Sequence, residues 1–234
     1  MTGVLGLIPA KGGSTRLAMK NIRALGGRPL LAWTAAAARQ SGIVDRLIVS
    51  TESPEVADVA RGLGLEVPFM RPAELARDPA GIADVALHAL DALERDGAIF
   101  DTIVVLLATC PLADAQDIRG AYDLFRRRPA SFVLSVAPFD HTPYIGVSMD
   151  AEGNVAPLFP QYYDLKSQDM PPAYRPNGAV QVASVAALRA QRTLSGKPLL
   201  GYLMPVERSI DIDTEFDFQC AEAMAAVRGD KVRC

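Results

Sequence analysis

Small and basic residues gather near the start of the chain, in the segment Pro9 to Asn21 (PAKGGSTRLAMKN). Its two adjacent glycines let backbone N–H groups approach an anion closely, and Ser14 and Thr15 add hydroxyl groups. Three residues add positive charge: Lys11, Arg16 and Lys20. The spacing matches neither the GxGxxG fingerprint nor the GxxxxGK[ST] loop. We expect a loop that binds a triphosphate; the alternative is a glycine-rich turn with solvated lysines.

Paired carboxylates lie in a second segment, Ser209 to Asp213 (SIDID). In an extended chain, residues two apart face the same way, so Asp211 and Asp213 would share one side while Ile210 and Ile212 pack on the other. Magnesium is commonly held by one or two carboxylates together with water and phosphate oxygens. The pair therefore predicts a magnesium site beside a nucleoside triphosphate. The alternative is that Asp213 helps to cap the following helix and Asp211 is solvated.

These segments need a scaffold, and the hydrophobic pattern predicts one. Short runs rich in β-branched residues alternate with Ala/Leu-rich helical segments, as in parallel sheets covered on both faces. Strands are expected at Val4–Ile8, Arg46–Ser50, Leu65–Met70, Thr102–Ala108, from Ser131, at Ala179–Val182 and at Leu199–Met204. Helices are expected from Pro29 to near Gly42, from an N-cap at Ser53 to Gly64, around Asp84–Arg95, at Ala115–Arg128, near Val185–Gln191, and after a capping box of Thr214 and Asp217. The fold class is doubly wound α/β, in which ligands bind at the carboxyl ends of the strands.

Residues 138–176 interrupt this alternation. They contain seven prolines among aromatic side chains, with little helical periodicity. We expect one domain over residues 1–234, with 138–176 as an insertion that packs on a partner subunit or roofs a pocket. The alternative is an ordinary long surface connection.

Composition limits the class of protein. The chain has 234 residues, of which 50% are hydrophobic and 22% charged, which excludes a disordered chain or a coiled coil. A net charge of -3 disfavours nucleic-acid and membrane-surface partners. The odd set Cys110, Cys220 and Cys234 forms no CxxC pair, so we expect a reducing cytoplasm. The first apolar run is interrupted at Pro9, and neither secretion nor membrane insertion is expected.

Five motifs resemble those of one enzyme family and occur in that family's order. They are IPAKGGSTRLAMKN, RPAEL at 71–75 with Asp78 beyond it, CPL at 110–112, RPNGA at 175–179, and SIDID leading to Ala221-Glu222. Together they resemble the acylneuraminate cytidylyltransferases, or CMP-sialic acid synthetases, over almost the whole chain. That resemblance implies a Rossmann-like domain with a dimerisation arm, a homodimer, and use of magnesium and CTP to activate a nine-carbon 2-keto sugar acid. The arm would be residues 138–176.

The resemblance also implies roles for individual residues. The nucleotide would lie against Ala10, Lys11, Gly12, Gly13, Ser14, Arg16, Lys20, Asn21 and Arg71. Asp211 and Asp213 would hold the metal and, with Lys20, serve catalysis. The sugar acid would meet Arg175, Asn177, Gly178 and Gln181.

Departures from the family pattern gather in the sugar half of the predicted site. Lys11 occupies the position of the usual arginine. The substitution keeps the positive charge but loses the ability to donate two parallel hydrogen bonds to one phosphate. Leu107 stands where the family has a glutamine, Ala113 replaces an arginine and Gln181 a tyrosine, and Leu199-Leu200 fall near a pair of phenylalanines that flank the sugar in the family. We therefore expect CMP transfer from CTP to the anomeric hydroxyl of a sialic acid-like 2-keto-3-deoxy sugar acid. Alternatives are a pseudaminic, legionaminic or eight-carbon acid, or a CTP-binding regulatory protein without transferase activity.

Overall fold

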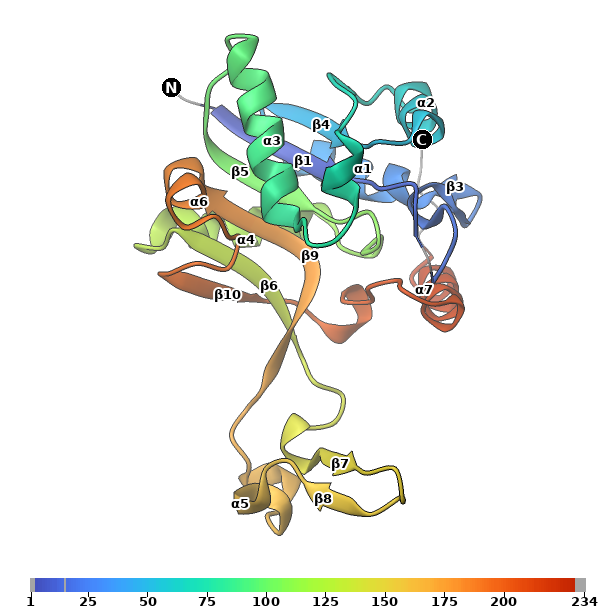
Figure 1. Cartoon of the computed structure of the whole chain (residues 1–234), viewed down its shortest axis with the longest axis vertical. Coiled ribbons are helices and arrows are strands. Elements are labelled where there is room, and N and C mark those ends of the chain that lie inside the picture. Colours follow the sequence, from blue (N-terminus) through green and yellow to red (C-terminus); the bar gives the residue numbers. More distant parts are fainter. Residues whose placement is uncertain (1–2, 15, 230–234) are drawn as a thin grey trace.

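The computed structural model describes residues 3–14 and 16–229, and its centre is a six-stranded sheet with helices on both faces (Figure 1). The strand order is β10-β6-β9-β5-β1-β4. The strands are β1 (Gly3–Pro9), β4 (Arg46–Ser50), β5 (Phe100–Leu106), β6 (Phe132–Pro138), β9 (Tyr174–Ser184) and β10 (Leu199–Leu203). β1 pairs in parallel with β4 and β5, and β6 with β10, while β9 runs antiparallel between β5 and β6. The doubly wound, mostly parallel α/β fold is confirmed.

Within the described residues, six helices lie around the sheet, and apolar clusters cover its two faces. The helices are α1 (Leu30–Ser41), α2 (Pro54–Gly62), α3 (Ile82–Arg95), α4 (Ala115–Arg127), α6 (Val185–Gln191) and α7 (Glu215–Val227). Leu31 of α1 and Ile118 of α4 belong to the core on one face, and Leu90 of α3 and Leu188 of α6 to the core on the other. A third cluster unites Leu17, Leu25 of the short hairpin β2 (Ala24–Leu25) and β3 (Arg28–Pro29), Trp33, Ile212 and Phe218. It joins the first loop to the segment before α7.

Both N-caps are confirmed, but one predicted strand is absent, and another is present with a different length and direction. The Ser53 hydroxyl accepts a hydrogen bond from the Val56 amide, and Thr214 forms its capping box with Asp217. Residues 65–70 make two isolated bridges to 48 and 51 instead of a strand. Pro68 lies between these bridges and has no N–H to donate to a ladder. The strand expected at Ala179–Val182 is the eleven-residue, antiparallel β9, because the chain re-enters the sheet from the inserted segment.

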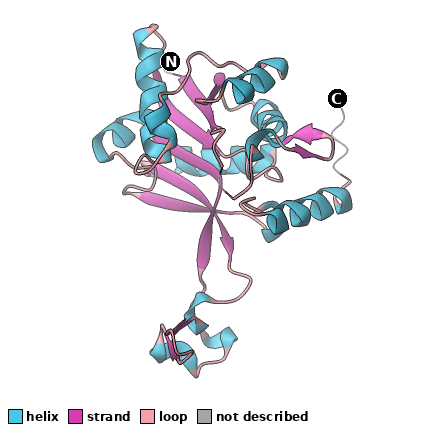
Figure 2. Cartoon of the chain, turned by 45° about the vertical axis from the view of Figure 1, so that its right-hand side comes forward, coloured by secondary structure: helices cyan, strands magenta, loops and turns pink. Residues whose placement is uncertain are grey.

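The inserted segment projects from the far ends of β6 and β9 as a small separate lobe (Figures 1 and 2). It contains β7 (Val147–Met149), β8 (Val155–Pro157), α5 (Pro160–Tyr163) and the single turns Pro143–Ile145 and Ser167–Asp169. Tyr144 packs on Phe159 and Tyr162, with ring centroids 5.7 and 4.6 Å apart. Several large apolar side chains of the lobe are exposed: Ile145, Met149, Val155, Leu158, Tyr163 and Leu165.

Two further expectations concern cysteines and membranes. Cys110 is buried and Cys220 is partly buried, and both are free thiols; Cys234 lies outside the described residues. Among residues 3–14 and 16–229, no helix has the length and apolar character needed to cross a membrane.

Candidate active site

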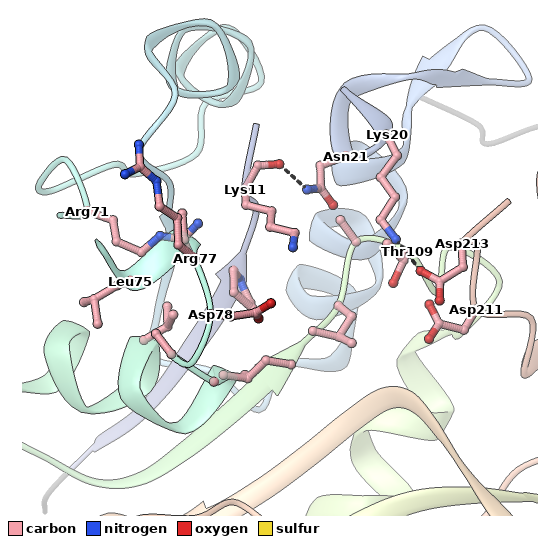
Figure 3. A pocket seen from close by; sticks show the side chains of 18 residues that line it. Lys11, Lys20, Asn21, Arg71, Leu75, Arg77, Asp78, Thr109, Asp211 and Asp213 are labelled. Carbon is pink, nitrogen blue, oxygen red and sulfur yellow. Dashed lines mark hydrogen bonds and ion pairs between the residues drawn. The ribbon is translucent and has the colours of Figure 1, made fainter. Parts of the chain in front are cut away.

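A pocket opens at the carboxyl ends of β1 and β5 (Figure 3). One wall carries Arg71, Leu75, Arg77 and Asp78, and the opposite wall carries Lys20, Thr109, Asp211 and Asp213, with Lys11 between them. Six residues that sequence analysis assigned to the nucleotide or the metal therefore line one cavity: Lys11, Lys20, Asn21, Arg71, Asp211 and Asp213. These residues come from three segments far apart in the chain.

The glycine-rich loop follows β1 and is closed by its own hydrogen bonds. The Asn21 amide donates to the carbonyl of Lys11 at 2.8 Å, and the Ser14 hydroxyl accepts from the Leu17 amide at 3.4 Å. Buried Ala10 donates its N–H to the Ser50 carbonyl. Five residues assigned to the nucleotide lie on the loop but not among the residues that line the cavity: Ala10, Gly12, Gly13, Ser14 and Arg16. Thr15 lies outside the described residues.

Lys20 joins this loop to the carboxylate segment. Its ammonium donates to Asp213 at 2.7 Å and to the carbonyl of Ile212 at 2.9 Å, and its side chain is 12% exposed. Arg16 pairs with the other oxygen of Asp213 at 2.8 Å from a more exposed position. Lys20 thus stands at the pocket surface with its charge partly desolvated, which strengthens its attraction for an anion.

Asp211 and Asp213 share one side of their segment, as predicted. Ile212 between them is fully buried, and its N–H donates to the carbonyl of Thr109 at 2.8 Å. Burial raises the pKa of Asp211, and the nearby negative charge of Asp213 adds to this, against a hydrogen bond from Thr109 that lowers it. The alternative reading of this segment is wrong, because Thr214 supplies the cap of α7 and Asp211 is partly buried.

The donor set fits magnesium. The negative charges of Asp211 and Asp213 lie close together, and that of Asp211 is partly desolvated. A divalent cation between them would relieve their repulsion. The described part of the chain contains no cluster of three or more His, Cys, Asp or Glu side chains arranged around a metal. Such a sparse set suits an ion that takes most of its ligands from phosphate and water.

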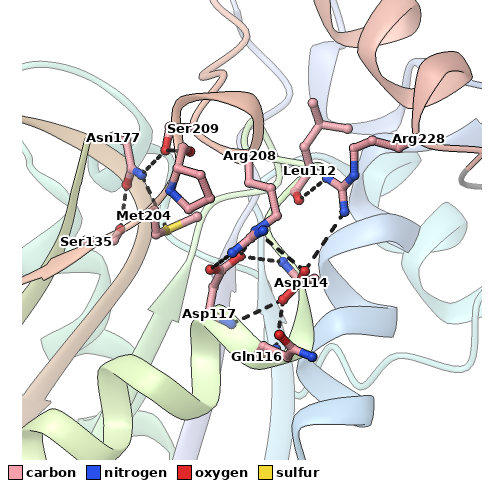
Figure 4. Close-up of polar contacts among 11 residues, drawn as sticks. Leu112, Asp114, Gln116, Asp117, Ser135, Asn177, Met204, Arg208, Ser209 and Arg228 are labelled. Atoms are coloured by element: carbon pink, nitrogen blue, oxygen red, sulfur yellow. Dashed lines mark hydrogen bonds and ion pairs between the residues drawn. The ribbon is translucent and has the colours of Figure 1, made fainter. Parts of the chain in front are cut away.

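The residues assigned to the sugar acid lie on β9, outside the cavity lining. Asn177 is 1% exposed: the Ser135 hydroxyl donates to its carbonyl oxygen at 2.5 Å, and its amide donates to the Ser209 hydroxyl at 2.8 Å (Figure 4). Gly178 has a φ of +74°, and a Cβ there would stand 3.0 Å from Leu107 and 3.5 Å from the Asp211 carboxylate. Asn177 therefore anchors the segment that leads to Asp211. Because Gly178 has no side chain, the space beside the Asp211 carboxylate stays open.

The substituted positions of the sugar half have mixed environments. Leu107 lines the cavity. Gln181 lies on β9 between Val105 and Leu134, and its buried side-chain oxygen accepts no hydrogen bond within the described residues. Arg175 is partly exposed near the start of β9. Leu200 packs into the core, whereas Leu199 is 39% exposed.

Three residues that matter to this geometry were missed by sequence analysis: Glu52, Thr109 and Arg208. Arg208 donates two hydrogen bonds of 2.8 Å to fully buried Asp117 of α4, which fixes the turn Val206–Arg208 just before the carboxylates (Figure 4). Glu52 and Thr109 closely follow the carboxyl ends of β4 and β5, so the rule for α/β sheets identifies both positions. Arg208 has no comparable signal in the sequence.

Comparisons with known proteins agree with this arrangement. A family model described as cytidylyltransferase matches residues 5–144. A CMP-N,N'-diacetyllegionaminic acid synthase from Legionella pneumophila is 33% identical over 94% of this chain and 95% of its own length. A pseudaminic acid cytidylyltransferase from Campylobacter jejuni is 28% identical over 94% and 95%. An N-acylneuraminate cytidylyltransferase from Escherichia coli is 31% identical over 94% of this chain and 51% of its length.

Solved structures show the same fold at low sequence identity. A CMP:2-keto-3-deoxy-manno-octonic acid synthetase complexed with CTP has a TM-score of 0.74 and 14% identity, covering 97% of this chain and 100% of the other. A 4-diphosphocytidyl-2C-methyl-D-erythritol synthase from Anaerococcus prevotii has a TM-score of 0.67 and 12% identity, covering 96% and 99%. The Rossmann-like fold, the family model and the full-length relatives agree: the chain belongs to the cytidylyltransferase family.

Proposed function

We propose that this cytidylyltransferase transfers CMP from CTP to the anomeric hydroxyl of a nine-carbon 2-keto-3-deoxy sugar acid and releases pyrophosphate. The observation that carries the proposal is one pocket lined by three cationic side chains, Lys11, Lys20 and Arg71, together with the carboxylates of Asp211 and Asp213 (Figure 3). Cations suit the phosphates, and paired carboxylates suit the ion that accompanies them. The names of the relatives support the substrate class.

The chemistry requires alignment and charge neutralisation. The sugar hydroxyl attacks the α-phosphate of CTP, the bond to the β-phosphate breaks, and no covalent enzyme intermediate forms. Magnesium, held by Asp211 and Asp213, would polarise the phosphate oxygens. Lys20 and Lys11 place positive charge where negative charge builds on the phosphates. Lys20 is already oriented by Asp213 before the nucleotide arrives.

The acceptor falls within a class of related acids. The full-length matches to a legionaminic and a pseudaminic enzyme support these acids beside the sialic acid-like one. Leu107 places an apolar side chain in the pocket where the family resemblance implies a hydrogen-bonding one. The apolar substitution favours an acid whose groups at that point are methyl or N-acyl rather than hydroxyl.

A single assay tests the proposal. We expect pyrophosphate release from CTP only when a nonulosonic acid is present, with a panel of N-acetylneuraminic, legionaminic, pseudaminic and eight-carbon acids ranking the acceptor. CTP affinity without pyrophosphate release for any acid would instead favour a regulatory CTP-binding protein. The free thiols of Cys110 and Cys220 favour a reducing cytoplasm as the place of this activity.

We further propose that two chains form a homodimer through the inserted segment 138–176, whose lobe lies between the end of β6 at Pro138 and the start of β9 at Tyr174. The lobe exposes apolar side chains on a long projection, and a surface of this kind is typical of a subunit interface. The cavity has a volume of about 250 Å³, which is below the usual range for a ligand site and small for two substrates. A partner's lobe that covers the open side of the sheet would complete the acceptor site.

The variant Tyr163→Glu tests the proposed interface. Tyr163 is 48% exposed, whereas Tyr162 packs on Tyr144 inside the lobe, so Tyr163→Glu leaves the lobe's own packing intact. We expect light scattering to show a shift toward monomer, and the KM for the acid to rise more than that for CTP. Phe216→Glu, at an exposed aromatic of α7, is the matched control and is expected to leave the mass unchanged. A fully active wild-type monomer at micromolar concentration would refute both parts.

Lys20→Ala tests the phosphate assignment. Loss of the ammonium is expected to weaken CTP binding or slow transfer by about tenfold, because one charge-assisted contact disappears. The ranking of sugar acids should not change. Lys197→Ala, at an exposed lysine just before β10 and outside both the pocket and the lobe, is the control. An effect confined to the affinity for the acid would contradict the assignment.

A further inference from the structure

One carboxylate, that of Glu52, connects the two halves of the nucleotide pocket. It lies two residues after the end of β4, between the glycine-rich loop and Arg71. Its Oε1 accepts the backbone N–H of Gly12 at 2.8 Å, and its Oε2 accepts from the guanidinium of Arg71 at 2.5 Å. Neither the motifs nor the family resemblance assigns a role to Glu52.

The backbone around Glu52 is built to keep this arrangement. The Ala10 N–H donates to the Ser50 carbonyl at 3.0 Å, and the Arg71 N–H donates to the Thr51 carbonyl at 2.8 Å. The loop, the end of β4 and residue 71 therefore run side by side. A Cβ on Gly12 would stand 2.6 Å from the Cβ of Ser53, so the loop approaches the start of α2 as closely as glycine allows.

Glu52 orients a guanidinium that borders the pocket. The side chain of Arg71 is 3% exposed and that of Glu52 17%, so water screens their attraction little. Arg71 Nε is buried and has no hydrogen-bond partner within the described residues, which leaves the bond to Glu52 to fix the rotation of the group. Burial alone would raise the pKa of Glu52, but hydrogen bonds from Arg71 and from backbone amides, Gly12 among them, outweigh burial and lower it. The carboxylate is therefore charged at neutral pH.

The two groups that Glu52 holds belong to different sides of the pocket region. Gly12 belongs to the loop that carries Lys11, where phosphates are expected. The wall around Arg71 includes apolar side chains that suit the flat face of a base: Leu75, Ile82 and Val85. A fixed spacing between loop and wall sets the distance between phosphate and base contacts.

We propose that Glu52 is a positioning residue that holds the glycine loop and Arg71 as one unit, so that the phosphate and base ends of the nucleotide are bound together. Glutamine cannot replace it, because one amide oxygen accepts from only one of the two donors while the NH₂ group faces the other. This inference rests on the proposed function, since it requires CTP in this pocket.

The test compares the affinities of the full chain for CTP, for pyrophosphate and for cytidine, without acid or metal. In Glu52→Gln we expect the Kd for CTP to rise at least tenfold and the values for both fragments to rise at least threefold. The matched control is Glu66→Gln, which breaks an arginine–carboxylate pair with Arg46 at the other, exposed end of β4 and should leave all three values unchanged. Circular dichroism at the assay temperature confirms that each variant is folded.

Each outcome decides the inference. Should Glu52→Gln not fold, Glu52→Asp replaces it, because aspartate keeps the charge but is one methylene too short to span both donors; the same rises are expected. A folded variant with a CTP affinity within twofold of wild type overturns the proposal, as does weakening of only one fragment. Wild-type protein that binds no CTP overturns the proposed function as well, so the two failures are distinguishable.

Discussion

Asn in place of Asp211 or Asp213 is expected to lower turnover by about 10²-fold or more while the fold persists. A neutral amide oxygen binds magnesium weakly and leaves phosphate charge uncompensated. Asp213→Asn has a further effect, because Lys20 and Arg16 lose the carboxylate that orients them. We therefore expect the KM for CTP to change more in Asp213→Asn than in Asp211→Asn.

The measurement is the initial rate of pyrophosphate release over a range of magnesium and CTP concentrations. Asp58→Asn on α2 is the control, because Asp58 is an exposed carboxylate paired with Arg61 on the surface. Thermal unfolding should show that both active-site variants keep the wild-type fold, since neither side chain belongs to an apolar cluster. Near wild-type turnover in both variants would contradict the assignment of Asp211 and Asp213 as metal ligands.

The carboxylate pair illustrates what sequence can predict. Alternation of Ile and Asp over the four residues 210–213 is a local pattern, and local geometry places Ile212 in the core and Asp211 and Asp213 in the pocket. The glycine-rich loop and the N-caps at Ser53 and Thr214 were predicted for the same reason. Each of these features depends on residues within a few positions of one another.

Features that depend on distant parts of the chain were not predictable in this way. The direction of β9 depends on where the inserted segment returns, and no residue within the strand records that. Asn177 belongs to a motif that implies a substrate contact. Its side-chain amide, however, is hydrogen-bonded to Ser135 and Ser209, which come from other elements. Whether it also meets the acid stays a prediction.

Arg208 is the clearest case of such a distant contact, since its partner Asp117 lies 91 residues away. Asp117 is 0% exposed and lies in the first turn of α4, where its carboxylate accepts a hydrogen bond from the N–H of Asp114. The guanidinium supplies two further hydrogen bonds to this carboxylate. Without it, a buried charge would lack its main compensation.

Arg208→Met is therefore expected to lower the free energy of unfolding by about 3 kcal/mol, at the low end for a buried pair because Arg208 is 26% exposed. Arg127→Met is the matched control: it removes an arginine that pairs with Asp123 on the exposed end of α4, and should cost about 0.5 kcal/mol or less. Urea unfolding of the two variants at neutral pH measures the difference. Equal stabilities would show that the buried pair contributes no more than the surface pair.

A double variant separates the buried charge from general damage at this position. Arg208→Met with Asp117→Leu removes both charges, and part of the lost stability should return because no unpaired carboxylate remains in the interior. Activity should not return with it. The turn Val206–Arg208 directly precedes the segment that carries Asp211, and the bonds that fix it to α4 are absent in both variants. Recovery of turnover together with stability would mean that Arg208 supports the fold alone and does not position the carboxylates.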